Sequence, residues 1–390
     1  MNGVIKMKRS IKIVLTTLGF FAALLLAWIV YINLPKQDPS VTTLIQASAE
    51  SQDELEVEVE TEVEVETEVK RLPFTIGVAY SPSYLISVGG LEKFHPFDIR
   101  KYQRINDALL KDEILTAQQT RSPAPLTRDD LLLVHTESYL EELKIRSKVA
   151  AYLEAPLLNL APVSLDESVL KPFRHASGGT ILAAKQSLIS GIGINIGGGY
   201  HHAKPDKGEG FCLYADVPIA IRRLQKEGLI QRAVVVDVDV HQGNGTILCL
   251  ANDDQTFTFS MHQGDIYPTP KEHGDLDVEL NSGMDDQQYM KVLNKHLPGV
   301  LDKANADICF IVGGCDTLQG DPLASLNMTH QGIVNRDQAI IDACIKRNLP
   351  VVLTLSGGYS KDAWKSQYLS IKNLIERQGL DQQTGIENQP

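Results

Sequence analysis

The stretch VVVDVDVHQGNG, from Val234 to Gly245, determines how the rest of this sequence is interpreted. It opens as a run of β-branched residues, which is typical of a parallel strand buried on both faces. Because side chains alternate along a strand, Asp237, Asp239 and His241 are predicted to point to one face. Buried carboxylates and an imidazole are costly unless they are paired or bind a cation. The stretch therefore favours a metal site, with Asp239 and His241 as ligands, over a buried Asp–His hydrogen bond beside a turn.

Polar loops at strand ends are the second signal. Residues 242–245 are loop formers, which places the polar groups at the carboxyl end of the strand, where open α/β sheets bind ligands. Three other predicted strands end in similar loops: Gly197-Gly198-Gly199-Tyr200-His201-His202, Gly313-Gly314-Cys315-Asp316 and Ser356-Gly357-Gly358-Tyr359. Each loop alone is a weak signal, but four of them together are a strong one. A catalytic zinc usually has three protein ligands and an open position, which Asp239, His241 and Asp316 would supply.

The fold class is predicted to be α/β. Strand-like and helix-like segments alternate along the chain, as expected for a mainly parallel sheet covered by helices. The predicted strands are 74–78, 193–196, the central strand opening at 234, 256–261, 307–312 and 350–355. The predicted helices are 98–110, 126–143, 176–190, 216–226, 287–301, one after 329, and 361–377. We expect a single three-layer domain over residues 72–378.

The N-terminal region predicts a membrane anchor. Residues 13–34 are apolar and uncharged, long enough to cross a bilayer as a helix. Four basic residues lie within positions 6–12, so the positive-inside bias places residues 1–12 in the cytoplasm. We expect an uncleaved signal anchor rather than a cleaved signal peptide or a core helix. This single-pass topology would put the catalytic domain outside the cytoplasm, in the periplasm or at the cell exterior.

Composition limits the remaining choices. The chain has 390 residues, of which 43% are hydrophobic and 22% charged, enough for a large core. Eight alternating glutamates between residues 54 and 68 contribute −8 to the net charge of −12, which leaves −4 elsewhere. Residues 35–71 are therefore predicted to be an acidic, disordered linker, and residues 379–390 a flexible tail. The acidic balance argues against direct nucleic-acid binding. Five cysteines without a C-x-x-C pair are interpreted as buried thiols.

These motifs give the chain a family resemblance. From about residue 74 to residue 377 it resembles the histone deacetylase superfamily, the zinc branch of the arginase–deacetylase fold. The segments GGGYHHA, GFCLYAD, VVDVDVHQGNG, FSMH, GGCDTLQGDP and LSGGY occur in the family's order. The spellings GGGYHHA, HQGNG and SGGY are similar to those of the class IV subgroup.

The resemblance implies catalytic roles that agree with the chemistry of amide hydrolysis. His202 would be the general base, oriented by Asn244, and a neutral imidazole suits that role. His201, paired with Asp237, would be the electrostatic partner and a proton donor, because the carboxylate favours its protonated form. Tyr359 would hydrogen-bond the substrate carbonyl and the oxyanion that develops from it.

The resemblance also implies ligand sites. Asp239, His241 and Asp316 would hold one zinc ion, which lowers the pKa of bound water to about 7. A potassium ion beside the zinc would be bound through Asp237, Asp239, His241, Ser260 and Met261. The walls of the acyl-lysine channel would include Gly199, Gly210, Phe211 and Tyr267.

The predicted function is a zinc-dependent amidohydrolase, acting on non-peptide C–N bonds, that removes acetyl or longer acyl groups from lysine-like amines. An acylated lysine or a small acylated amine would be the substrate, and an outward-facing domain would meet molecules other than chromatin. An acetylpolyamine deacetylase shares all of this chemistry and stays open as an alternative. An arginase-like ureohydrolase is disfavoured because the carboxylates for a second metal are missing after His241 and Asp316. A non-catalytic binding domain is disfavoured because every expected catalytic residue is present. The oligomeric state is left open.

Overall fold

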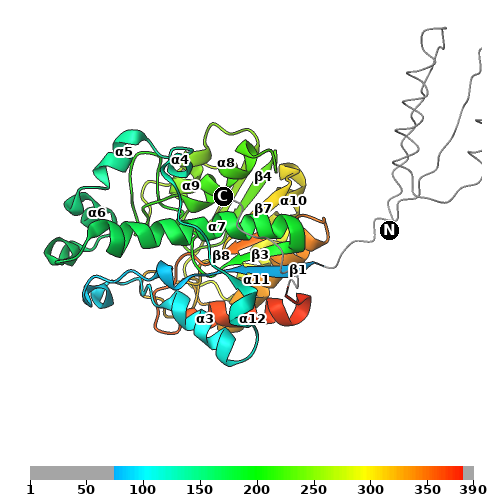
Figure 1. The fold of residues 1–390 in the computed structure, drawn as a ribbon. Coiled ribbons are helices and arrows are strands. Elements are labelled where there is room, and N and C mark those ends of the chain that lie inside the picture. The colour runs from blue at the N-terminus through cyan, green and yellow to red at the C-terminus, as the bar shows by residue number, and fades with distance from the viewer. Residues whose placement is uncertain (1–73, 381–390) are drawn as a thin grey trace, which may run out of the picture. The chain divides into compact units, whose positions relative to one another are not determined.

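A sheet of eight parallel strands runs through residues 74–380, the part of the chain that this computed structural model describes (Figure 1). The strands are β1 (Thr75–Ala79), β2 (Thr120–Arg121), β3 (Gly191–Asn195), β4 (Ala233–Asp237), β5 (Thr256–Gln263), β6 (Leu276–Leu280), β7 (Ile308–Val312) and β8 (Val351–Thr354). Their order across the sheet is β2-β1-β3-β8-β7-β4-β5-β6, and every pair of neighbours is parallel. The prediction of an α/β domain built on a parallel sheet is confirmed.

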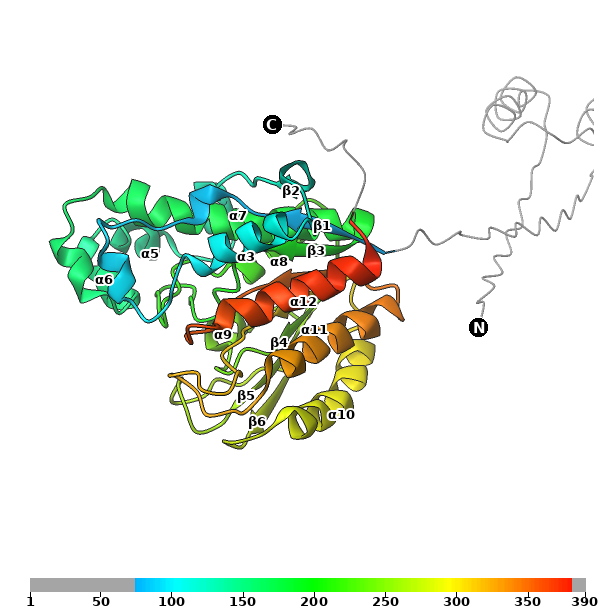
Figure 2. The same ribbon diagram turned by 90° about the horizontal axis from the view of Figure 1, so that it is seen from below.

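Helices cover both faces of the sheet. They are α3 (Lys101–Lys111), α4 (Arg128–Leu131), α5 (Glu137–Glu142), α6 (Arg146–Tyr152), α7 (Lys171–Ser190), α8 (Asp216–Lys226), α9 (Asn244–Leu250), α10 (Asp286–Ala304), α11 (His330–Ile345) and α12 (Ala363–Gln378). α7, α8 and α9 lie on one face, and α3, α12, α11 and α10 lie side by side on the other (Figure 2). Because both faces are covered, central strands such as β7 (ICFIV) are wholly apolar and wholly buried.

Close packing of α7 on β3 depends on a glycine. A Cβ at Gly193 would lie 1.9 Å from the main-chain oxygen of Ala183 in α7, so any side chain there would push the helix off the sheet. This packing seats α7 across β1, β3 and β8. The loop after β3, which carries the tandem histidines, is therefore anchored to a helix and to a central strand.

The structure corrects one predicted helix and adds an edge strand. The helix expected at 126–143 is split into α4 and α5, because Thr127 and Thr136 each cap a new helix start. His135 lies between the two helices and forms its hydrogen bonds with other parts of the chain. Its Nδ1 lies 3.0 Å from the Lys204 oxygen, and its Nε2 accepts from the Ala215 amide at 3.0 Å. The edge strand β6 was not predicted, because its sequence LDVEL is only partly buried and carries acidic residues.

The central strand ends earlier than predicted. β4 stops at Asp237, so Asp239 and His241 lie in the segment that follows it rather than on a strand face. Beyond that point, backbone amides donate to side chains instead of to a neighbouring strand. Asp237 Oδ1 accepts from the amide of Asp239 at 3.1 Å, and Asp239 Oδ1 accepts from the amide of His241 at 3.0 Å. Such local bonds compete with the sheet ladder. Residues 242–245 were predicted as loop, but α9 begins at Asn244.

The prediction of a membrane-anchored protein is corrected as well. Among residues 74–380, no helix combines the length and the apolar composition needed to cross a bilayer. The longest of them, α7, has 20 residues but carries Lys171, Arg174 and Lys185. The anchor expected at 13–34 was inferred from hydropathy, which reports an apolar run and not a helix, and it lies outside the described residues. The single-pass topology and the extracytoplasmic location were therefore wrong as predictions and are withdrawn.

The other terminal predictions fall largely outside the described residues. These are the N-terminal segment 1–12, the acidic linker 35–71 and residues 381–390 of the expected tail. The first residues of that tail are described, and they are paired: Gly379 accepts a hydrogen bond of 3.0 Å from the Ile76 amide, and Leu380 bridges to the same residue of β1.

Candidate active site

Four loops meet at the carboxyl edge of the sheet. They follow β3, β8, β7 and β4, which are consecutive neighbours in the sheet. Because these strands are parallel, their carboxyl ends lie at one edge. The structure thus brings together the histidines after β3, the acidic segment after β4, the carboxylate after β7 and the tyrosine after β8, as the sequence predicted.

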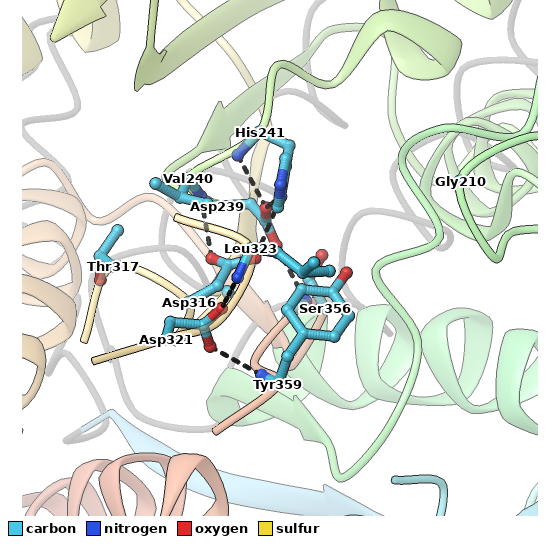
Figure 3. A network of polar contacts seen from close by, with 12 residues as sticks. Gly210, Asp239, Val240, His241, Asp316, Thr317, Asp321, Leu323, Ser356 and Tyr359 are labelled. Atoms are coloured by element: carbon cyan, nitrogen blue, oxygen red, sulfur yellow. Dashed lines mark hydrogen bonds and ion pairs between the residues drawn. The ribbon is translucent and has the colours of Figure 1, made fainter. Parts of the chain in front are cut away.

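Asp239, His241 and Asp316 form a buried cluster whose ligand atoms all lie within 4.8 Å of one another. His241 Nδ1 is 3.2 Å from Asp239 Oδ1 and 3.2 Å from Asp316 Oδ2. Backbone amides hold the other carboxylate oxygens: that of Gly357 donates to Asp239 at 2.8 Å, and that of Val240 to Asp316 at 2.9 Å. Figure 3 shows these three side chains converging beside the ring of Tyr359. Main-chain amides therefore orient both carboxylates of the cluster.

The charge balance of this cluster suits a cation. Burial and the neighbouring Asp239 raise the pKa of Asp316 to about 7. Burial alone would lower the pKa of His241, but the two carboxylates outweigh it and raise that pKa to about 10. The two buried carboxylates therefore make this a site that attracts positive charge. One imidazole nitrogen and two carboxylate oxygens are a normal donor set for Zn²⁺, so the residues fit this metal.

The tandem histidines have different partners. His201 Nδ1 lies 2.8 Å from Asp237 Oδ2, and His202 Nδ1 lies 2.7 Å from Asn244 Oδ1. Burial opposes protonation of His201, but Asp237 and Asp239 raise its pKa to about 9. Burial and the nearby charge of His201 lower the pKa of His202 well below its usual range. At neutral pH one imidazole is thus cationic and the other neutral, although their rings are only 4.0 Å apart.

Tyr359 is delivered by the loop after β8. Its ring stands edge-on to His241 at 6.1 Å and to Phe211 at 5.9 Å. Asp321 fixes its backbone, because one carboxylate oxygen accepts from the Tyr359 amide at 2.8 Å (Figure 3). Desolvation and the nearby carboxylates raise the pKa of Tyr359, so its hydroxyl keeps its proton as a donor. The loop needs Gly357 as well, since a Cβ there would lie 2.1 Å from Asp316 Oδ2.

An apolar cavity of about 220 Å³ opens onto these groups. Its wall includes Gly199, Phe211 and the two histidines after β3, and it continues along aliphatic and aromatic side chains that include Val88, Phe97, Leu153, Leu157, Val169 and Phe173. Phe211 follows Gly210 in a tight turn with left-handed backbone at both residues. A Cβ at Gly210 would lie 2.5 Å from the His202 ring, so the turn presses closely on that histidine. The Tyr267 ring flanks His202 at 5.0 Å.

The residues expected to bind potassium are two members of the cluster, Asp239 and His241, and three residues on β4 and β5. Asp237 and Ser260 are direct partners in the register of β4 and β5, and Met261 follows as a buried residue. Ser260 Oγ is 2.9 Å from His262 Nδ1, and Asp237 already contacts His201. Potassium binding at this position stays a prediction.

Comparison with known proteins identifies the family. The model of the histone deacetylase domain matches residues 95–374. A protein named histone deacetylase 2, from Arabidopsis thaliana, is 37% identical over 311 residues, which cover 79% of this chain and 80% of the relative. This chain belongs to the histone deacetylase family.

Two further matches agree with membership of the histone deacetylase family. An uncharacterised protein of Picosynechococcus is 36% identical over 307 residues, covering 78% of this chain and 96% of that protein. The crystal structure of the HDA15 HD domain superposes with a TM-score of 0.64 at 20% identity, over 78% of this chain and 92% of that one, and shows that the fold is shared. The predicted superfamily is confirmed, and the family supports a deacetylase, hence a hydrolase. The class IV assignment and the residue roles stay predictions.

Sequence reasoning missed several residues that hold this histone deacetylase site in place. Lys101 is buried and donates to the main-chain oxygens of Ser356 and Gly357 at 2.6 and 2.9 Å. Asp216 accepts from the amides of Gly199 and Tyr200 at 2.9 and 2.7 Å. Asp216 ends the segment GFCLYAD, which was a signal without an assigned role.

Arg336 was also missed, because nothing in its local sequence marks it. It is fully buried in α11, and its Nη1 donates to the carbonyl oxygens of Val238 at 3.1 Å and Gly314 at 2.7 Å. Those two residues lie immediately before Asp239 and two residues before Asp316. One guanidinium therefore connects the backbones that carry both carboxylates of the cluster.

Proposed function

We propose that this protein is a zinc-dependent deacylase that removes acetyl or longer acyl groups from lysine-like amines. The observation that carries the proposal is the buried cluster of Asp239, His241 and Asp316 beside two histidines with unlike partners, a carboxylate for one and an amide for the other. Such a pairing provides a base and an acid at the same pH. Amide hydrolysis needs both, one to activate water and one to protonate the leaving amine.

Zinc held by Asp239, His241 and Asp316 would supply Lewis-acid chemistry, polarising the substrate carbonyl and lowering the pKa of water to about 7. The chain's own groups supply the proton transfers. His202 is neutral and bonded to Asn244 through Nδ1, so its Nε2 is the atom that accepts a proton.

His201 keeps its proton because Asp237 faces its Nδ1 at 2.8 Å. Its cationic ring lies 4.0 Å from that of His202, where it offsets the negative charge that develops during attack. The Tyr359 hydroxyl donates a hydrogen bond to the oxygen on which this charge appears. The amine then leaves with a proton from the imidazole pair.

The acyl group would occupy the apolar cavity. Its volume of about 220 Å³ exceeds what an acetyl group fills, and its wall is mostly hydrocarbon. Two large apolar side chains are 76% exposed here: Phe94, which lines the cavity, and Leu160, which lies three residues after the lining residue Leu157. Burying a methylene contributes roughly 0.8 kcal/mol, so each extra carbon of a bound chain would strengthen binding until the cavity is full.

A substrate panel tests this function. The full chain, loaded with one equivalent of zinc, is assayed with acetyl-, octanoyl- and myristoyl-lysine peptides and with acetylated polyamines. We expect hydrolysis of acyl-lysine with kcat/KM rising from acetyl to a longer chain, and its loss in Tyr359→Phe. Preferential hydrolysis of acetylpolyamines would make these, and not acyl-lysine, the substrate class. Failure to cleave any acyl-amine would overturn the proposed function.

A further inference from the structure

Glu209 lies at the end of a chain of hydrogen bonds that starts at His202. His202 Nδ1 is 2.7 Å from Asn244 Oδ1, and Asn244 Nδ2 donates to Glu209 Oε1 at 3.1 Å. We propose that Glu209 positions the base His202 by holding the amide of Asn244 in a single orientation. The proposal rests on the proposed role of His202 as the base. It makes Glu209 a positioning residue, since it touches neither substrate nor metal ligands.

The donors and acceptors of this hydrogen-bond chain determine how the Asn244 amide is oriented. An amide side chain is nearly symmetric in shape, so Asn244 alone could turn either its oxygen or its nitrogen toward His202. An ionised carboxylate only accepts hydrogen bonds. Glu209 therefore selects the orientation in which the Asn244 NH₂ group faces it and the oxygen faces His202. The imidazole must then carry its proton on Nδ1, which leaves the lone pair on Nε2 free.

The same carboxylate oxygen also bonds to Tyr267, which the sequence predicted as a wall of the acyl-lysine channel. Tyr267 donates its hydroxyl hydrogen to Glu209 Oε1 at 2.7 Å, and its ring lies edge-on to His202 at 5.0 Å. Glu209 thus links the orientation of the base to the position of the Tyr267 ring. A tight turn supports it, because Glu209 and Cys212 exchange two backbone hydrogen bonds of 3.1 and 2.9 Å.

Two lysines keep this carboxylate charged. Lys204 and Lys207 place their ammonium groups 3.1 and 3.0 Å from Glu209 Oε2, on the side away from Asn244. Partial burial would raise the pKa of Glu209, but the bond from Tyr267 and the two ammonium groups lower it to about 2. The acceptor is therefore ionised throughout the range in which the enzyme would work. Its negative charge also stabilises the protonated form of His202 after that ring has accepted a proton.

The kinetic test uses the zinc-loaded full chain and a double-mutant cycle. Glu209→Ala should lower kcat about 10-fold, the scale of a lost orienting partner, with unchanged zinc content. Glu209→Gln should have a kcat between those of wild type and Glu209→Ala, because its amide can turn either its oxygen or its nitrogen toward Asn244. In an Asn244→Ala background, Glu209→Ala should change kcat less than 2-fold. Tyr267→Phe should mainly raise KM, which separates the channel wall from the base.

Glu227→Ala is the matched control. Glu227 pairs with Lys185 and Arg223 on the surface of α8, as Glu209 pairs with two lysines, but it has no link to His202. This control should keep wild-type kcat. The proposal is overturned if Glu209→Ala also keeps wild-type kcat, or if it loses the same factor with and without Asn244.

A second measurement does not depend on turnover or on any variant. In the wild-type chain labelled with ¹⁵N-histidine, we expect the ring of His202 to carry its hydrogen on Nδ1. A hydrogen on Nε2 would overturn the assignment of Glu209 even in an active enzyme. A chain with the expected tautomer but no activity on any acyl-amine would instead refute the proposed function and leave the hydrogen-bond chain intact.

Discussion

Replacing Arg336 tests how the backbones that carry Asp239 and Asp316 are held. In Arg336→Met, the carbonyls of Val238 and Gly314 lose a charged donor, and each unpaired buried group costs about 1–3 kcal/mol. Asp337, which is 2% exposed, loses its 2.9 Å bond from Arg336 Nε. Removing one partner of a buried ion pair leaves the other charge unpaired and costs about 3–5 kcal/mol of stability. Because these costs overlap, we expect the free energy of unfolding to fall by about 3–5 kcal/mol.

Urea denaturation of the full chain, with a chelator present so that metal binding does not contribute, measures this loss. The double variant Arg336→Met/Asp337→Asn removes the unpaired charge and should recover part of it. Arg336→Met should also bind zinc more weakly, since it loosens the segments before Asp239 and Asp316. A loss below about 1 kcal/mol, or a double variant no more stable than the single one, would refute the reasoning.

Three further outcomes are expected. Asp239→Ala and Asp316→Ala should each lose bound zinc, measured by metal analysis, since two ligands do not hold an open tetrahedral site; stoichiometric zinc in either would contradict the ligand set. Tyr359→Phe should fold and keep zinc but lose about 10²–10³ in kcat, and near-normal turnover would exclude an oxyanion donor. Burial lowers the pKa of His135 from 6.5 to about 4. Because the unfolded chain binds the proton first, this residue's contribution to stability should fall as the pH drops from 6.5 to 4, and His135→Gln should flatten that part of the pH–stability curve.

The sheet and the site residues were predictable because their signals are local. Runs such as Val351–Thr354 are too apolar for anything but a covered strand, and glycine followed by a polar residue marks where such a strand ends. The parallel order of the sheet then brings those ends together. The residues Asp239, His241, Asp316 and Tyr359 could therefore be grouped before any coordinates were known.

What could not be predicted depends on distant partners. Lys101 and Arg336 lie in helices, and they bond to main-chain oxygens 255 residues away, at Ser356, and 98 residues away, at Val238. The length of β4 could not be judged either, because Asp237 and Asp239 bond to the backbone amides two residues ahead. Hydropathy likewise cannot replace an observed helix, as the withdrawn membrane anchor shows.

The position of β8 has a consequence for how the protein is made. β8 is the last strand to be synthesised, yet it lies between β3 and β7 in the middle of the sheet. Until residues 351–354 have left the ribosome, β2-β1-β3 and β7-β4-β5-β6 have no strand to join them. Nascent chains would then expose two unfinished edges, which is a risk for aggregation and a reason for chaperone contact. A chain truncated before β8 would lack both the middle of the sheet and Tyr359, so its site would stay incomplete whatever its metal supply.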